Sequence, residues 1–197
     1  MPRLADPALP ARRRAQILEA ARACFAARGF RQTTIEEICA EAGISPGALY
    51  RYFGSKADIV AAITLDARTT AEAALDRLSG AERLLDGLTE MARAFFDSFA
   101  RDEGLMAEIW AEAARDPELA GALNQRDRIT VGRLAAAIEN AARGGSVYPA
   151  LAPEDAAELL IAALEGMALR RALGRLRSAD PVLRFRVLAL HVLKPKR

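Results

Sequence analysis

Helical periodicity covers nearly the whole of this 197-residue chain and restricts its fold more than any other feature. Alanine, leucine, arginine and glutamate dominate the periodic segments and favour helices, whereas β-branched and aromatic residues are sparse. Prolines stand at the ends of these segments and not inside them. The sequence therefore predicts an all-α protein of about nine helices, without a sheet.

Glycine and proline signals set the expected boundaries of these helices. We expect helices over residues 11–28, from near Thr34 to Gly43, for about two turns from Pro46, and over 56–78, 81–101, 103–114, 117–142, 153–177 and 181–193. Residues 1–10 lack periodicity and are expected to form a mobile arm. We expect residues 11–56 to form one domain and residues 57–197 another.

Charge is unevenly distributed, although the net charge is only +2. Residues 1–57 contain nine basic and five acidic residues, whereas the rest contains 19 basic and 21 acidic residues. A basic N-terminal quarter on a slightly acidic body suits a nucleic-acid-binding segment joined to a regulatory part. Chance scatter in an arginine-rich chain is the alternative.

The stretch from Thr33 to Lys56 contains two short helical patterns around a glycine. Both Thr33 and Thr34 are spaced from a glutamate as in a capping box, and Gly43 ends the first pattern. Ser45 is the expected N-cap of the second helix, with Pro46 at its first position. Helix, short turn and helix, braced by a preceding helix, predict a helix-turn-helix whose second helix enters the major groove.

The second helix carries more polar and aromatic surface than packing requires. Leu49 and Phe53 stand four apart and are expected to face inward. The residues left for the outer faces are Ser45, Pro46, Gly47, Tyr50, Arg51 and Tyr52. Their hydroxyl, guanidinium and ring groups suit phosphates, base edges and thymine methyls. We interpret this face as a DNA-binding surface.

Several cations occupy first turns of helices, where the helix dipole disfavours them. Arg12, Arg13 and Arg14 begin one helix and Lys56 begins another. A phosphate bound across both N-termini would compensate, with Arg13, Arg14 and Lys56 as its partners. For the arginines, solvation at a frayed helix start is an equal alternative.

The segment "GFRQTTIEEICAEAGISPGALYRYFGSKADIV" resembles the DNA-binding segment of TetR-family transcriptional regulators, over about Ala11 to Val60. The likeness implies that Thr34, Ser45, Pro46, Gly47, Tyr50, Tyr52 and Lys56 contact operator DNA. Cys39 stands where the family usually has alanine, and Arg51 is at a variable position. Base specificity therefore does not carry over.

The central helices hold most of the large apolar residues, and the family resemblance implies an inducer site there. Methionine and aromatic side chains between helices can line an adaptable cavity, although most such residues are simply core. The proposed lining comprises Met91, Phe95, Phe99, Met106, Glu108, Ile109, Trp110, Glu112, Leu134, Ile138 and Met167.

Glu108 and Glu112 share one face of their expected helix and would suit a cationic or hydroxylated ligand if that face points inward. Solvation is the more common fate of such a pair. The segment "EIWAEAARDPELA" is similar to the regulatory domain of the betaine-pathway repressor subgroup, but this likeness identifies no ligand. An apolar or cationic inducer is expected.

The last helix, "PVLRFRVLALHVL", leaves almost no polar face and must be covered on both sides. A two-fold four-helix interface with the preceding helix and the copies of both would cover it, as the family does. The expected interface residues are Leu160, Leu164, Met167, Val182, Phe185, Ala189 and Val192, and we place His191 there too. A dimer predicts an inverted-repeat operator.

We therefore expect a cytoplasmic, homodimeric DNA-binding repressor that a small molecule releases from DNA, and not an enzyme, a metal protein or a cofactor protein. Residues 11–56 are the expected helix-turn-helix DNA-binding domain, and residues 57–197 the expected regulatory, ligand-binding and dimerisation domain. One alternative is a helical interaction protein that does not bind DNA. Another is a serine hydrolase, since Gly43 to Gly47 spells G-x-S-x-G and His191 lies downstream, but that motif requires a strand before Ser45. Cys24 and Cys39 are expected to be small core residues. No segment reads as a signal peptide or a membrane span.

Overall fold

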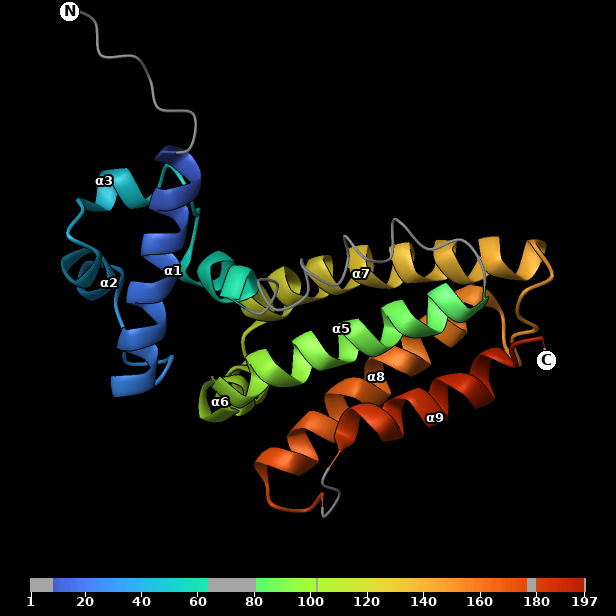
Figure 1. Cartoon of the computed structure of the whole chain (residues 1–197). Coiled ribbons are helices and arrows are strands. Elements are labelled where there is room, and N and C mark those ends of the chain that lie inside the picture. Colours follow the sequence, from blue (N-terminus) through green and yellow to red (C-terminus); the bar gives the residue numbers. More distant parts are fainter. Residues whose placement is uncertain (1–8, 64–80, 102, 177–179, 197) are drawn as a thin grey trace, which may run out of the picture. The chain divides into compact units, whose positions relative to one another are not determined.

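The computed structural model describes residues 9–63, 81–101, 103–176 and 180–196. The chain divides into two compact units (Figure 1). The head unit comprises residues 1–64 and 104–122, and the trunk unit comprises residues 65–103 and 123–197. The head unit is thus built from two separate stretches of chain and includes residues beyond the expected 11–56.

The head unit begins with α1 (Leu9–Arg28), α2 (Ile35–Ala42) and the short α3 (Pro46–Leu49). A further helix starts at Lys56 and is described as far as residue 63. The unit also holds all but the first residue of α6 (Glu103–Ala113) and the beginning of α7 (Pro117–Arg143). Most of the expected mobile arm, and residues 64–78 of the expected fourth helix, lie outside the described residues.

Apolar side chains from each of these N-terminal helices form the core of the head unit. Ile17, Ala21 and Phe25 of α1 are buried, as are Ile38 of α2 and Leu49 of α3. Their spacing is the three- and four-residue pattern that the sequence predicted. Burial of these faces holds α1 against α2 and α2 against α3, which fixes the position of the exposed side of α3.

Two helices are shorter than expected. The regular part of α3 ends at Leu49, after which Tyr52 and Phe53 both donate to the Leu49 carbonyl in a tighter turn. α8 (Pro153–Ala172) ends five residues before the expected residue 177. Gly174 has a positive φ of 64°, which other residues rarely adopt and which ends the helix there.

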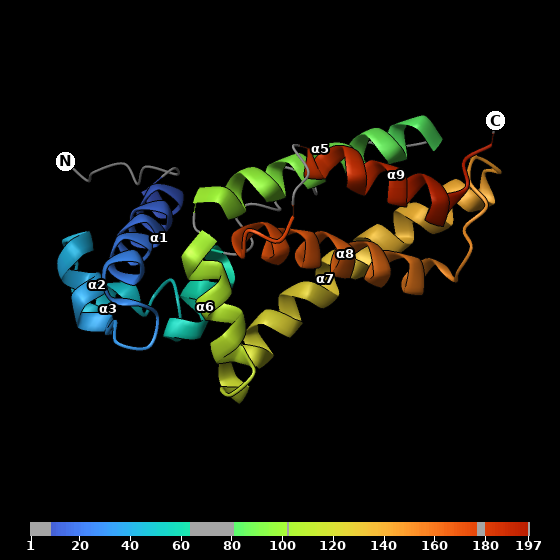
Figure 2. The ribbon, with the colours of Figure 1, turned by 90° about the horizontal axis from the view of Figure 1, so that it is seen from below.

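The trunk unit contains α5 (Ala81–Arg101), most of α7, α8 and α9 (Pro181–Leu193). α9 packs against both α5 and α8, and the two views show α8 and α9 side by side (Figures 1 and 2). The described residues contain no strand, only an isolated bridge between Val147 and Pro195. Within them, no helix is both long enough and apolar enough to cross a bilayer.

The faces of α8 and α9 differ from the expected dimer interface. Five of its seven residues are buried inside the subunit: Leu160, Leu164, Phe185, Ala189 and Val192. Met167 and Val182 are half-buried. Because α9 is apolar nearly all round, periodicity does not reveal which face points inward. These five residues pack within the subunit and offer little surface to a partner copy, and the expected dimer interface stays a prediction.

A different apolar face is exposed on the same two helices. It comprises Leu159, Ala162 and Gly166 of α8 and Leu183 and Val187 of α9, and we call it the α8/α9 face. His191 is exposed one turn beyond Val187, and its Nδ1 lies 2.8 Å from the Val187 carbonyl oxygen. Adjacent exposed leucine and valine side chains, with small residues that permit close approach, are typical of a helix-packing surface.

Candidate nucleic-acid interface

Capping interactions fix both ends of the turn between α2 and α3. The Thr34 hydroxyl accepts from the Glu37 N–H at 3.2 Å, and the Glu37 carboxylate accepts from the Thr34 N–H at 2.9 Å. Thr34 therefore forms the capping box, as one of the two predicted alternatives. At α3, the Ser45 hydroxyl accepts from the Ala48 N–H at 3.3 Å, and Pro46 follows at the first helical position.

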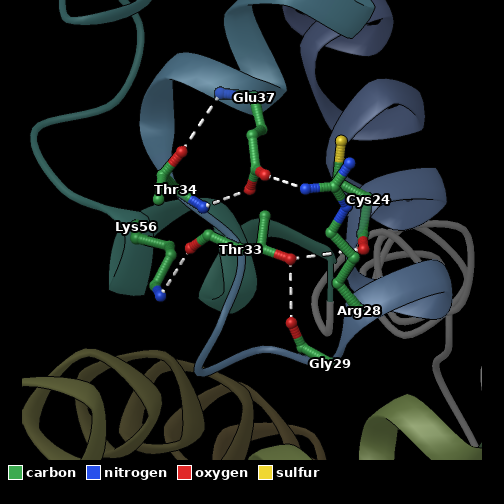
Figure 3. Close-up of polar contacts among 7 residues, drawn as sticks. All are labelled: Cys24, Arg28, Gly29, Thr33, Thr34, Glu37 and Lys56. Atoms are coloured by element: carbon green, nitrogen blue, oxygen red, sulfur yellow. Dashed lines mark hydrogen bonds and ion pairs between the residues drawn. The ribbon is translucent and has the colours of Figure 1, made fainter.

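Thr33, the other candidate for the cap, points inward and is almost completely buried. Its hydroxyl donates to the carbonyl of Gly29 at 2.8 Å and lies 3.2 Å from that of Cys24 (Figure 3). Arg28 pairs with Glu37 across the same region. Thr33 thereby joins the end of α1 to the start of α2, while Thr34 remains exposed.

The outward side of α3 carries the side chains that the sequence assigned to DNA. Ser45, Pro46, Gly47 and Arg51 are exposed. Tyr50 is 54% exposed, and Tyr52 is half-buried. Leu49 and Phe53 point inward, as expected. Neither tyrosine belongs to the core, so their rings and hydroxyls are available to a partner.

The two arginines proposed as phosphate contacts lie on α1 and are half-buried. The Arg14 guanidinium carbon lies 5.1 Å from the centroid of the Phe53 ring, which follows α3. Arg13 donates to the side-chain oxygen of Gln16, whose amide nitrogen donates to the carbonyl of Ala42 at the end of α2. Both cations are thus placed near the helix-turn-helix.

Lys56 is less free than the sequence suggested. Its ammonium donates to the backbone carbonyls of Phe30 at 2.8 Å, Thr33 at 2.9 Å and Arg31 at 3.4 Å. Burial lowers the pKa of Lys56, while the negative charges of Asp116, Glu112 and Glu108 act in the opposite direction. The ammonium thus lies within hydrogen-bonding distance of three backbone carbonyls, so Lys56 supports the α1–α2 loop.

An open cavity of about 500 Å³ adjoins this region within the head unit. Tyr50, Arg31 and Lys56 contribute to its lining, as do three acids: Glu112, Asp116 and Glu118. Arg31 and Glu112 lie 3.8 Å apart across it, although the arginine is largely exposed. Charges of both signs line the cavity, so its electrostatics do not favour an anion or a cation strongly.

The proposed inducer-lining residues fall into the two units. Met106, Glu108, Ile109, Trp110 and Glu112 belong to the head unit. Met91, Phe95, Phe99, Leu134, Ile138 and Met167 belong to the trunk unit, where all but the half-buried Met167 are buried. Phe95 lies 5.9 Å from Phe96 and 6.0 Å from Phe99 between ring centroids.

The carboxylate of Glu108 accepts from the backbone N–H of Phe30 at 2.8 Å, a role that the sequence analysis missed. No sequence signal could have revealed it, because the partners are 78 positions apart and the acceptor is an ordinary helical glutamate. Phe30 itself was also missed, although an aromatic residue directly after a helix-ending glycine is a plausible anchor for the loop.

The two cysteines differ in burial. Cys39 is buried, as predicted, whereas Cys24 is only half-buried. Burial raises the pKa of both thiols, and nearby glutamates add to this effect: Glu41 and Glu37 at Cys24, and Glu36 at Cys39. A raised pKa reduces the thiolate fraction at neutral pH, and with it nucleophilic reactivity.

The capping box should contribute pH-dependent stability through Glu37. The hydrogen bond from the Thr34 N–H is the main cause that lowers the Glu37 pKa from its ordinary value of 4.5, and the Arg28 charge lowers it further. A lowered folded-state pKa stabilises the protein above about pH 4.5 and loses this effect as the pH falls through the folded value. We expect Glu37→Gln to unfold at lower urea concentration than the parent at pH 7, with the difference shrinking on acidification.

Urea unfolding from pH 7 to about pH 3 measures this effect. Glu36→Gln is the matched control, because Glu36 is exposed in the same first turn of α2 and forms no part of the capping box. It should leave the pH dependence unchanged. Parallel curves for Glu37→Gln and the parent would contradict the assignment.

Two family profiles match the chain. The profile described as "Bacterial regulatory proteins, tetR family" covers residues 17–63 and includes the helix-turn-helix. The profile described as "BetI-type transcriptional repressor, C-terminal" covers residues 84–189. The second match spans more than half of the chain and bears out the likeness seen in the central segment.

Individual proteins give the same result. The HTH-type transcriptional regulator TtgR of Pseudomonas putida is 30% identical over 166 residues, covering 80% of this chain and 79% of its own. The regulator UidR of Escherichia coli K12 is 29% identical over 136 residues, or 69% of each protein. The structure of GusR from Salmonella enterica is similar with a TM-score of 0.69 and 29% identity, over 97% of this chain and 98% of that one.

Proposed function

The chain belongs to the TetR family of DNA-binding transcriptional regulators, and on that premise we propose that it is a repressor that a small molecule releases from its operator. The family consists of regulators and not of enzymes. The residues before Ser45 form α2 and a turn instead of a strand, and the Ser45 hydroxyl caps α3. The hydrolase alternative therefore lacks the local structure that it requires.

One observation carries the proposal: α3 is short and capped at a fixed position, and the turn that follows it exposes Tyr50 and Arg51. We assign Ser45, Pro46 and Gly47 to close backbone approach at the entry of the helix. Arg51 is suited to base edges and Tyr50 and Tyr52 to phosphates. Thr34, at the N-terminus of α2, contributes a second approach to the DNA backbone.

Arg13 and Arg14 add positive charge beside this surface, and we assign them to phosphates. Lys56 has a different role from the one first expected. Its hydrogens already point at carbonyl oxygens, so we assign it a long-range electrostatic contribution to DNA affinity and support of the loop, instead of a direct phosphate hydrogen bond.

We propose a homodimer formed through the α8/α9 face. Leu159, Leu183 and Val187 are large apolar side chains left exposed on adjacent helices, and the small Ala162 and Gly166 permit close contact. An isologous interface of two helices and their copies would bury this face on both subunits. Two recognition helices related by two-fold symmetry would read an inverted repeat.

For the inducer we retain the trunk residues Met91, Phe95, Phe99, Leu134, Ile138 and Met167 as the proposed lining. Methionine and phenylalanine side chains can repack around an apolar ligand. Glu108 and Glu112 have partners on the α1–α2 loop, so they no longer support a cationic inducer. A ligand that binds better to the conformation that does not bind DNA would shift the population and release the operator.

Selection of binding sites from random DNA duplexes by the purified protein tests this function. We expect one inverted repeat to be enriched, and binding to weaken steeply with salt because phosphate contacts release counterions. The repeat placed at a promoter in a cytoplasmic reporter should lower expression when the protein is present. No enrichment over several rounds would instead favour the helical interaction protein.

A further inference from the structure

Phe30 is held at both of its backbone polar groups by charged side chains from distant parts of the head unit. Its N–H donates to the Glu108 carboxylate at 2.8 Å, and its carbonyl accepts from the Lys56 ammonium at 2.8 Å. The same ammonium lies 4.4 Å from the centroid of the Phe30 ring, which packs 5.6 Å from that of Phe25. Hydrogen bonds to charged groups are stronger than neutral ones, so these contacts fix Phe30 firmly.

Other polar groups of the loop also have hydrogen-bond partners. Lys56 also donates to the carbonyl of Arg31. Figure 3 shows its contact with the Thr33 carbonyl and the hydrogen bond from the Thr33 hydroxyl to the Gly29 carbonyl. The next residue, Thr34, is the N-cap of α2. The loop of residues 29–33 is thus clamped by Lys56 and Glu108 and leads directly into the helix-turn-helix. We call these two side chains the loop clamp.

Gly29 and Glu108 fit each other sterically. Gly29 has a φ of 81°, and a Cβ built on it would lie 2.7 Å from a Glu108 carboxylate oxygen. A larger residue would be strained by its backbone conformation and would also displace the carboxylate. The glycine therefore both ends α1 and leaves the space through which Glu108 reaches the Phe30 N–H.

We propose that Glu108 is a positioning residue for DNA recognition, because its hydrogen bond to Phe30 fixes the loop that sets α2, and α3 through α2. This inference rests on the proposed DNA-binding function. Lys56 donates only to carbonyl groups of the loop, so the Phe30 N–H depends on Glu108 as its acceptor. The acceptor comes from α6, so the placement of the recognition helix depends on a segment outside the expected helix-turn-helix domain.

The sign of the effect separates positioning from simple electrostatics. If Glu108 acted only through its charge, removing that charge would tighten binding to polyanionic DNA. If Glu108 positions the loop, loss of the acceptor weakens binding, because the loop samples conformations in which α2 and α3 are displaced. Glutamine retains a carbonyl oxygen at nearly the same place, and it should therefore preserve the geometry.

The experiment compares Glu108→Met, Glu108→Gln and Glu112→Met. Methionine retains length but removes both oxygens. Glu112 lies one turn further along α6, where its carboxylate is 3.8 Å from the largely exposed Arg31 side chain and not bonded to the Phe30 N–H. Hydrogen exchange is measured on peptides covering residues 29–34, and dissociation constants are measured for the duplex enriched by selection. Thermal unfolding reports whether each variant is folded.

We expect Glu108→Met to speed exchange of the Phe30 amide by about tenfold or more and to weaken DNA binding by about tenfold, as expected for a half-buried donor left without its partner. Glu108→Gln should stay near the parent in exchange, and its DNA affinity should be equal to or slightly above that of the parent. Glu112→Met should leave the exchange rate of the Phe30 amide unchanged, because that amide donates to Glu108 and not to Glu112. Glu108→Ala serves as the second variant if Glu108→Met does not fold.

Tighter or unchanged DNA binding by Glu108→Met would overturn the inference, as would unchanged exchange of the Phe30 amide. Equal loss of affinity in Glu108→Gln and Glu108→Met would also overturn it, since the retained oxygen would then not matter. If the parent itself binds no selected DNA, the proposed function fails. The exchange measurement then still decides whether Glu108 holds the loop.

Discussion

Leu183→Glu is expected to convert the proposed dimer to monomers. Leu183 is 57% exposed in the subunit and belongs to the α8/α9 face with Leu159 and Val187. A two-fold interface would contain the introduced carboxylate twice. Each carboxylate would lose its hydration without gaining a cationic partner. The cost of several kcal/mol is enough to shift a micromolar dimer to monomers.

Analytical ultracentrifugation at micromolar concentration measures this change, with circular dichroism to confirm the helical fold. Leu151→Glu is the matched control, because Leu151 is 44% exposed but lies in the loop before α8. It should remain a dimer. A dimer of unchanged stability in Leu183→Glu would place the interface elsewhere, whereas a monomeric parent would exclude a constitutive dimer.

Tyr50→Ala is expected to weaken operator binding by roughly 30- to 150-fold. Each subunit would lose one hydrogen bond and the packing of one ring, worth about 1 to 1.5 kcal/mol, and the dimer would lose both twice. Tyr50→Phe should lose only part of this affinity, because it keeps the ring. The subunit should unfold at the same urea concentration, since Tyr50 is largely exposed.

Fluorescence anisotropy with the selected duplex at one fixed salt concentration gives the affinities. The chain offers a close control in Tyr148, which is 56% exposed and lies in the loop between α7 and α8. Tyr148→Ala should bind DNA like the parent. Equal DNA affinities for Tyr50→Ala and Tyr148→Ala would contradict the assignment of Tyr50 to the DNA-binding surface.

Local signals in the sequence were sufficient to predict helix boundaries wherever these depend on residues close together in the chain. The capped start of α2, its end at Gly43, and the Ser45–Pro46 start of α3 all follow from side chains within four positions of one another. The ambiguity between Thr33 and Thr34 could not be resolved in this way. Burial of Thr33 depends on contacts with α1, which spacing does not encode.

The missed features depend on contacts between distant segments. The sequence could not identify the inward face of α9, because an almost wholly apolar helix has no polar side to orient it, and only packing against α5 and α8 decides which residues are buried. The carbonyl partners of Lys56 could not be predicted from local spacing, because they lie 23 to 26 positions earlier in the chain. Neither outcome has a signature in local periodicity.

The return of residues 104–122 to the head unit has a consequence for exchanging parts between regulators. A chimera that grafts only residues 1–64 onto a foreign regulatory domain would leave behind the glutamate that holds the Phe30 amide. A functional transplant must therefore carry α6 as well, or find an equivalent acceptor in its new host. The smallest transferable DNA-binding unit of this protein would therefore comprise two separate stretches of chain.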